Sequence, residues 1–207
     1  MSEESRIYGG VSAAERSSSR QDRLLAAATA LWGESGIAAV TVRGVCKAAG
    51  LTPRYFYEHF ANREELLVAV ADEVRDQLLA AMVGAGLSST GPAEARLRAA
   101  LEAFFETVAN TPYVHRIIAS DPTDVGALAQ RRRAVVDTVA DLVVDHAPAA
   151  LGFDPDPDFL RRAGIFITGG VDQIIEGWLA GTITGTAAEL AADCARMSIN
   201  VLQPPDR

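Results

Sequence analysis

The stretch TVRGVCKAAGLTPRYFYEHFANREELL, which runs from Thr41 to Leu67, decides the fold of the N-terminal part of this chain. Thr41 is a good N-cap for a helix over residues 42–49, because its hydroxyl can accept a hydrogen bond from a backbone amide one turn inside. Gly50 follows that helix, at a position where the chain needs a residue free to take a positive φ. The first part of the stretch therefore predicts a short helix that ends in a tight turn.

The second part of the stretch predicts the start of two more helices. Thr52 is placed to cap a short helix, and Pro53 occupies its first turn, where the missing N–H costs nothing. Asn62 caps a third helix, with Glu65 three residues later completing an N-x-x-E box. Two short helices joined by a glycine-containing turn are typical of a helix-turn-helix, whose second helix enters the DNA major groove. The apolar residues spaced to form one small core are Val45, Ala49, Leu51, Phe56 and Phe60.

The length and composition of the chain indicate a cytoplasmic protein. It has 207 residues, of which 49% are hydrophobic, and this is enough for a sizeable core. No run approaches the roughly 20 apolar residues that a membrane span needs, and the N-terminus MSEESRIYGG has no apolar secretion signal. Cys46 and Cys194 lie far apart in predicted helices, which favours free thiols in a reducing compartment.

The net charge of −8 is unevenly distributed along the chain. Residues 1–70 hold eight basic and eight acidic residues, which leaves 11 basic and 19 acidic residues for 71–207. Within residues 20–60 there are five basic and three acidic residues. A mildly positive helix-turn-helix end on an acidic remainder fits a DNA-binding domain joined to a part that does not touch phosphate. Because this positive patch is modest, we expect DNA affinity to depend on dimerisation.

Three regions are predicted along the chain: a disordered arm over 1–19, a helix-turn-helix domain over 20–67, and a ligand-binding and dimerisation domain over 68–207. The arm is rich in serine, glycine, alanine and charge, and it shows no periodicity. Arg16 and Arg20 at its end could reach an adjacent minor groove, although a solvated tail is the simpler interpretation.

Helical periodicity and chain-breaking residues predict where the remaining helices begin and end along the sequence. The first helix covers 20–35 and ends at Gly36, with Trp32 in the core. The helix that starts at Arg63 continues past Leu78, and GAGLSSTGP, residues 84–92, is the clearest break in the chain. Further helices are predicted at 93–110, 113–120, 123–146, 158–179 and 187–202, with a loop over 148–157.

The resulting fold class is all-α, with about nine helices. An N-terminal three-helix head that contains the helix-turn-helix is followed by a larger helical body. Thr123 or Asp124 caps the long helix that ends near His146, after a stop at Asp121-Pro122. The helix over 158–179 is apolar on most of its circumference, so we expect it to be buried on both sides.

The motif T-V-x-x-V-x-x-A-A-G-L-T, followed by F-Y-E-H-F-x-N-R-E-E-L-L, resembles the helix-turn-helix segment of the TetR family of transcriptional regulators. The resemblance is strong over about residues 20–74 and is architectural beyond them. It implies a small-molecule pocket in the body and a dimer made by the last two helices. Packing of those helices within one chain is the alternative. The glycines that would allow two copies to approach closely are Gly169, Gly170, Gly177 and Gly181.

Residues of the helix-turn-helix are predicted to contact DNA. Arg54 is the best base reader, because its fork matches the O6 and N7 of guanine. Tyr55 departs from the small hydroxyl residue frequent in the family, and its ring could touch a thymine methyl or the sugar-phosphate wall. Glu58 is awkward beside phosphates, and it either points away from DNA or accepts from a cytosine amine. The other residues of the predicted set contact the DNA backbone and fix the position of the protein on the duplex. The predicted set is Thr41, Arg43, Lys47, Thr52, Pro53, Arg54, Tyr55, Tyr57, His59 and Arg63.

Aromatic and apolar residues of the body supply the material of a small-molecule pocket. Plain core is the alternative for each of them. Asp121, Asp172 and Glu176 either answer a cationic ligand or form solvated faces. His115 and His146 do not have metal-ligand spacing, and we expect neither a metal nor a cofactor. The predicted ligand-binding set is Phe104, Phe105, Tyr113, His115, Ile118, Phe166, Ile174 and Trp178.

The leading hypothesis is a homodimeric transcriptional repressor that a largely apolar small molecule releases from a palindromic DNA operator. An activator of the same fold, or a regulator that responds to a protein partner, is the first alternative. An α-helical ligand carrier or enzyme is the second. The sequence has no P-loop, no G-x-G-x-x-G, no H-E-x-x-H and no recognisable nucleophile–base pair, so we expect no enzyme activity.

Overall fold

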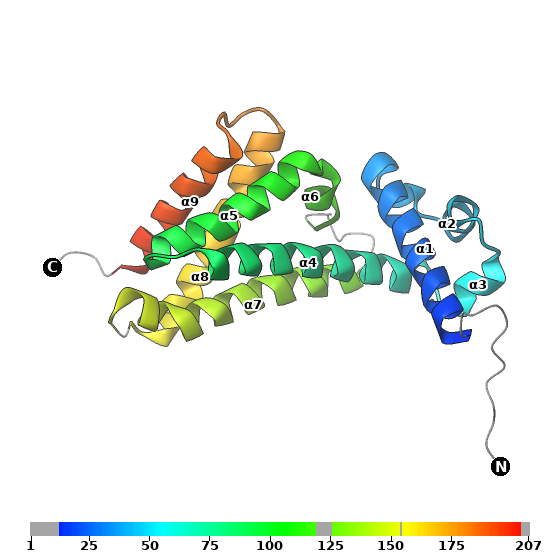
Figure 1. Ribbon diagram of the computed structural model, residues 1–207, viewed down its shortest axis with the longest axis horizontal. Helices are drawn as coiled ribbons and strands as arrows, with labels where there is room; N and C mark the ends of the chain where they lie inside the picture. Colours follow the sequence, from blue (N-terminus) through cyan, green and yellow to red (C-terminus); the bar gives the residue numbers. More distant parts are fainter. Residues whose placement is uncertain (1–12, 119–125, 154, 204–207) are drawn as a thin grey trace, which may run out of the picture. The chain divides into compact units, whose positions relative to one another are not determined.

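The computed structural model describes residues 13–118, 126–153 and 155–203, and these contain nine α-helices, one 3-10 helix and no strand (Figure 1). The all-α class and the number of helices predicted from the sequence are confirmed. The chain divides into two compact units, one ending at Glu73 and one beginning at Val74, which we call the head and the body. The dividing point lies inside a single helix, α4.

The head consists of short helices around a small aromatic core. Trp32 and Phe56 are fully buried in it, and the ring of Phe60 lies 5.7 Å from that of Phe56. Leu51 is half-buried, so the predicted small core is confirmed with Leu51 at its edge. The elements of the head are α1 (Ala13–Ser35), η1 (Ile37–Ala39), α2 (Val42–Ala49), α3 (Pro53–Tyr57) and the first residues of α4 (Arg63–Ser88).

The predicted caps of the head are present. The Thr41 hydroxyl accepts from the Gly44 amide at 3.0 Å, which starts α2. Gly50 has a φ of 63° and ends that helix in the left-handed region, which a side chain rarely adopts. Before α4, the Asn62 side chain accepts from the Glu65 amide at 2.9 Å. Thr52 is the N-cap of α3 by position, but its side chain makes no cap hydrogen bond.

The helix α1 begins at Ala13, which corrects the predicted start at Arg20. Residues 13–19 of the predicted arm are therefore helical. Two alanines and a glutamate at the start of α1 are good helix formers, and Arg20 contacts the rest of the head as described below. Residues 1–12 lie outside the described residues, as does the side chain of Arg16.

The body is built from two helix pairs. In Figure 1, α5 lies along α9, and α7 lies along α8. One buried cluster joins α5, α8 and α9 around Phe105 and Ile175, and a second contains Leu160 of α8 and Leu202 of α9. The elements are α5 (Ala93–Asn110), α6 (Pro112–Ile118), α7 (Gly126–Leu151), α8 (Pro157–Leu179) and α9 (Ala187–Leu202). The predicted bounds of α5 and α9 are confirmed.

Two predicted breaks are wrong. Residues 84–88 of the predicted break belong to α4, which continues to Ser88. A Cβ at Gly86 would lie 3.4 Å from a backbone oxygen of α5, so this glycine allows a close approach to α5 rather than ending α4. Similarly, α7 continues through Pro148 to Leu151, because Ala147 and Leu151 are packed in the second cluster.

Two further predictions concern chain ends and burial. The stop and cap predicted at 121–124 lie outside the described residues, as does the predicted stop at 204–205. Within its own chain α8 is buried on one side only, because Ile165 and Phe166 are 45% and 68% exposed, and its burial on both sides stays a prediction for a dimer. Only one side of α8 packs against the helices of its own chain, which leaves these apolar side chains in solvent.

Candidate nucleic-acid interface and effector region

The helix α3 buries one ring and exposes the side chains around it. Phe56 is fully buried and anchors α3 in the head, with its ring at 5.3 Å from that of Tyr57. Tyr57 itself is 60% exposed, and Thr52 and Pro53 are exposed at the start of the helix. The structure thus buries Phe56 and leaves the Tyr57 ring largely in solvent.

Arg54 is the most exposed charged side chain of α3. Its side chain is 85% exposed, and its Nε lies 3.2 Å from Oε1 of Glu58, one turn later. The Glu58 side chain is 38% exposed. The acidic residue that is awkward beside phosphates therefore forms an ion pair with the predicted base reader.

Tyr55 is half-buried and is not simply presented to solvent. The guanidinium of Arg20, on α1, lies 4.8 Å from the centre of the Tyr55 ring, in a cation–π arrangement. The Arg20 Nε is buried and has no hydrogen-bond partner within the described residues. This contact fixes Tyr55 from the α1 side, and sequence reasoning missed it because nothing in the spacing links residues 35 positions apart.

Arg63 and His59 are placed less favourably for phosphate contact than the sequence suggested. The Arg63 guanidinium donates to the backbone carbonyls of Ile37, at 2.6 Å, and Val40. It thereby ties the start of α4 to η1. The His59 side chain is half-buried, and its Nε2 is buried without a hydrogen-bond partner in the described part of the chain.

The helix α2 and its N-cap present polar residues to solvent. Thr41, Arg43 and Lys47 are all exposed. The hydroxyl of Thr41 caps α2, as described above, and the other two side chains are long cations on a short helix. Together with Arg54 and Tyr57, they give the head a set of exposed side chains that can donate hydrogen bonds to the phosphate oxygens of DNA.

Half of the predicted ligand-binding residues gather in one cluster of the body. The rings of Phe105 and Trp178 lie 5.7 Å apart, edge to face, and Phe104 and Ile174 pack against the same cluster. The Trp178 Nε1 donates to the carbonyl of Gly185 at 2.9 Å. These residues come from α5 and α8, and α9 closes the cluster.

The other four predicted ligand-binding residues do not lie in this cluster. His115 is buried on α6, and Tyr113 on the same helix is 38% exposed. Phe166 is 68% exposed on α8, so within one chain it lines no buried site. The side chain of Ile118 lies outside the described residues.

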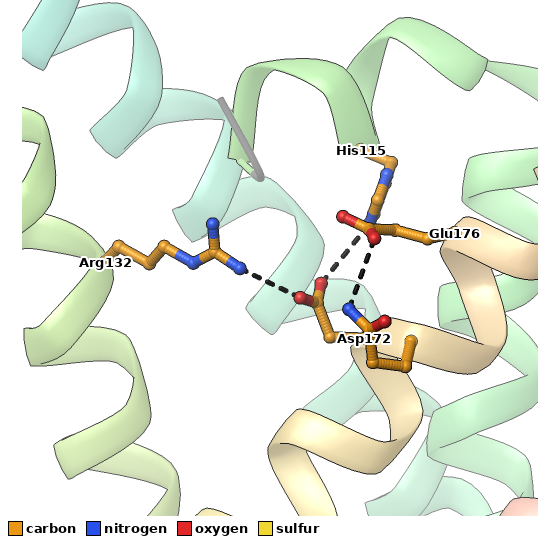
Figure 2. Close-up of polar contacts among 5 residues, drawn as sticks. His115, Arg132, Asp172 and Glu176 are labelled. Carbon is orange, nitrogen blue, oxygen red and sulfur yellow. Dashed lines mark hydrogen bonds and ion pairs between the residues drawn. The ribbon is translucent and has the colours of Figure 1, made fainter. Parts of the chain in front are cut away.

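His115 takes part in a polar network that joins α6, α7 and α8, and Figure 2 shows it. The Nε2 of His115 lies 3.3 Å from Oδ1 of Asp172, and Nη2 of Arg132 donates to the other carboxylate oxygen at 2.9 Å. Beside it, Gln173 donates to Glu176 at 3.2 Å. The hydrogen bond from His115 and the charge of Arg132 lower the pKa of the Asp172 carboxyl below its ordinary value.

This network bears on the alternative, raised by the sequence, that Asp172 binds a cationic ligand. The charge of Asp172 is paired within the chain, so it does not stand ready for a cationic ligand. Sequence reasoning missed Arg132 as its partner, because the two residues are 40 positions apart on different helices. Among the described residues, no group of three or more histidine, cysteine or acidic side chains could hold a metal ion. None of the helices that the structure describes is long and apolar enough to cross a membrane.

Comparison with known proteins finds relatives of the N-terminal part of the chain. Residues 24–70 match the family described as bacterial regulatory proteins of the tetR family. Over 129 residues the chain is 30% identical to the HTH-type transcriptional activator FasR of Mycolicibacterium smegmatis. That match covers 60% of this chain and 58% of the relative, so the chain spans less than two thirds of this curated relative's length.

Solved structures share the fold over most of the chain. A transcriptional regulator FadR from Bacillus subtilis, in complex with stearoyl-CoA, has a TM-score of 0.71 at 16% identity, with 86% of this chain and 97% of that chain covered. A TetR family transcription regulator from Marinobacter aquaeolei has a TM-score of 0.61 at 22% identity, covering 89% and 97%. The shared architecture is a capped helix-turn-helix followed by an all-α body. Residues 24–70 thus match the DNA-binding part of the tetR family of bacterial regulatory proteins, and the described helices share the fold of solved TetR-family structures.

Proposed function

We propose that this chain binds operator DNA as a homodimer and represses transcription until a small molecule releases it. Residues 20–67 form its DNA-binding domain in this proposal, and residues 68–207 its ligand-binding and dimerisation domain. The observation that carries the proposal is α3, which is anchored by the buried Phe56 and exposes Arg54 and Tyr57 after a capped turn. This is the presentation that a recognition helix needs in the major groove.

The DNA contacts follow from the exposed residues of the head. Arg54 reads guanine, and Tyr55 contacts a thymine methyl or the sugar. Arg43, Lys47 and Tyr57 bind phosphates, with Thr41, Thr52 and Pro53 at the helix starts. Arg63 and His59 support the head from within, since the Arg63 guanidinium is already bonded to two backbone carbonyls.

Dimerisation is supported by the apolar side chains that the body leaves exposed. Ile165 and Phe166 of α8 and Met197 of α9 are 45%, 68% and 46% exposed. Gly169 and Gly170, one turn after Phe166, have open space where a side chain would stand. Exposed apolar side chains on α8 and α9 favour association with a second copy, and a two-fold dimer reads paired half-sites.

The effector is a largely apolar small molecule that binds among α5, α6 and α8. The cluster around Phe105 and Trp178 supplies apolar walls, and the network at Asp172 supplies polar groups beside them. Because one structural relative is described in complex with stearoyl-CoA, long-chain acyl-CoA is the first ligand to test. The ligand must favour one of two dimer arrangements for DNA to be released.

Activation of transcription is the second candidate, and the FasR relative, which is named an activator, favours it. The two candidates differ in the effect of the bound dimer on transcription, not in the DNA-binding chemistry. A reporter driven by the bound promoter distinguishes them, because deletion of the regulator raises expression if it represses and lowers expression if it activates.

Selection from a pool of random duplexes tests the proposal. We expect the purified dimer to enrich a palindromic site, and the affinity for that site to fall steeply with salt because phosphates are neutralised. Arg54→Ala should cost about 1–3 kcal/mol of discrimination at one base pair of each half-site. A ligand carrier or an enzyme would enrich no duplex, and a monomer at all concentrations would also contradict the proposal.

Effector release is measured on the enriched site. Stearoyl-CoA, coenzyme A alone and a medium-chain acyl-CoA are added to the complex, and the DNA-bound fraction is followed. We expect release by the long-chain thioester and none by coenzyme A, because the proposed site is apolar. Trp178→Ala should weaken this release while the free dimer keeps its affinity for DNA.

A further inference from the structure

The ion pair between Arg54 of α3 and Glu58, its C-cap residue, is not explained by the stability of the helix. An arginine four residues before a glutamate is the less favourable order for a helical pair, and a carboxylate at the C-terminal end of a helix opposes the helix dipole. Glu58 is the C-cap residue of α3, and both side chains are exposed. A pair in this order contributes little to the stability of the fold.

The geometry of the pair leaves the reading edge of the arginine available. The Oε1 of Glu58 accepts a hydrogen bond from the Nε of Arg54 at 3.2 Å, and the side chain of Arg54 is 85% exposed. Within the described residues, the guanidinium has no other bonded acceptor from the protein. Its two terminal nitrogens are the pair of donors that match the O6 and N7 of a guanine.

We propose that Glu58 is a specificity-determining residue, which holds Arg54 by its Nε for base reading and repels phosphate from it. An unpaired arginine on the face of a DNA-binding helix can bind any phosphate, and this raises affinity without regard to sequence. The Glu58 carboxylate disfavours that use of Arg54, because it would lie next to the same phosphate. The proposal rests on the proposed DNA-binding function and extends it to a residue that contacts DNA only through its neighbour.

Glu58→Gln is the decisive variant, because glutamine keeps the size of the side chain and removes its charge. Wild-type protein, Glu58→Gln and Arg54→Ala are each used for selection from the same random duplex pool. Each is then titrated with the enriched site and with a duplex that lacks the site. Glu34→Gln, which removes an exposed charge from α1, is the control for net charge.

We expect Glu58→Gln to reduce the preference for guanine at the base pair that Arg54 reads by about twofold to fivefold, which corresponds to a surface ion pair. We also expect tighter binding to the duplex that lacks the site. Glu34→Gln should leave the preference unchanged. A wild-type preference in both Glu58→Gln and Glu58→Ala overturns the inference, because alanine also removes the acceptor for the Arg54 Nε.

The failures of the two proposals are distinguishable. If the wild-type protein enriches no duplex, the DNA-binding function is wrong and the inference falls with it. If the wild-type protein enriches a site but Arg54→Ala leaves every base preference unchanged, the function stands. The role of Glu58 is then overturned, because Arg54 reads no base for it to orient.

Discussion

The head and the body are both helical, but different properties of the sequence determine them. In the head, both boundaries of α2 and the start of α4 are set by local hydrogen bonds and backbone conformation, at Thr41, Gly50 and Asn62. In the body, α4 continues past its glycines and α7 continues through Pro148, because packing holds their ends in place. Local signals therefore suffice where helices are short, whereas packing decides where long helices end.

The surfaces of the two units differ as much as their cores. The head exposes Arg54, Tyr57 and the cations of α2, which suits a polyanion. The body exposes Ile165 and Phe166, which suits another apolar protein surface. If the two units have separate tasks, changes in one should leave the folding of the other largely intact.

The largest expected effect comes from removing one buried ring in each unit. Phe56→Ala should destabilise the head, and Phe105→Ala the body, by about 3–5 kcal/mol each, because both rings are fully buried. The chain has two tryptophans, and Trp32 lies in the head and Trp178 in the body. Denaturant unfolding is followed by fluorescence in single-tryptophan backgrounds, each compared with its own parent.

In that measurement, Phe56→Ala should lower the midpoint reported by Trp32 and leave the midpoint reported by Trp178. Phe105→Ala should do the reverse. Equal shifts of both midpoints in either variant would show that head and body unfold together, and the distinction between the two units would not hold for stability.

The next effect distinguishes two glycines of α8. A Cβ at Gly164 would lie 2.9 Å from the Cα of Ala140, so Gly164→Ala should push α7 and α8 apart and cost about 1–3 kcal/mol. Gly169 has open space within the chain, so Gly169→Ala should gain about 0.5–1 kcal/mol from helix propensity in a monomer.

Measurement of dimer dissociation further distinguishes Gly164 from Gly169. If α8 packs against a second copy near Gly169, Gly169→Ala should raise the concentration at which the dimer dissociates in sedimentation or light scattering. Gly164→Ala should instead lower the unfolding midpoint. An unchanged dissociation constant for Gly169→Ala would place the dimer interface elsewhere.

The sequence predicted most of the fold because its signals were periodic or local. The bounds of α5 and α9 follow from amphipathic spacing, and the capping box of Thr186 and Glu189 begins α9. The start of α1 was missed because its serine-rich first turns carry no apolar stripe, and contacts such as that of Arg20 with Tyr55 hold the helix.

The candidate sites were less predictable than the fold. Exposure of Arg54 followed from the helix-turn-helix pattern, but the bonds of Arg63 to the carbonyls of Ile37 and Val40 did not. A sequence shows that an arginine is present but not which acceptor it reaches. For the same reason the pairing of Asp172 with Arg132 was not foreseen.

A smaller effect is expected from the polar network of the body. Asp172→Asn removes the charge that Arg132 and His115 contact, and it should cost about 1–2 kcal/mol at neutral pH. The pKa of Asp172 is lowered in the folded chain. The stability that its charge contributes is therefore present above the ordinary carboxyl pKa of about 4, and it is lost as the pH falls through the lowered folded value.

Unfolding of wild-type protein and Asp172→Asn is compared at a series of pH values from 7 down to 3. The difference in stability between them should stay constant down to about pH 5 and shrink below pH 4. A difference that grows on acidification would contradict the assignment. Glu64→Gln, an exposed change in the head, gives the baseline for the loss of one carboxylate.

The smallest effect compares two threonines of the head that stand at similar positions. Thr41 accepts from the Gly44 amide at 3.0 Å, so Thr41→Ala should cost about 1 kcal/mol, whereas Thr52 makes no cap hydrogen bond and Thr52→Ala should cost only a few tenths. The Trp32 fluorescence midpoint measures both. Equal losses would mean that helix starts in the head depend on position alone, and the side-chain hydrogen bond would then no longer explain why local signals determine the head.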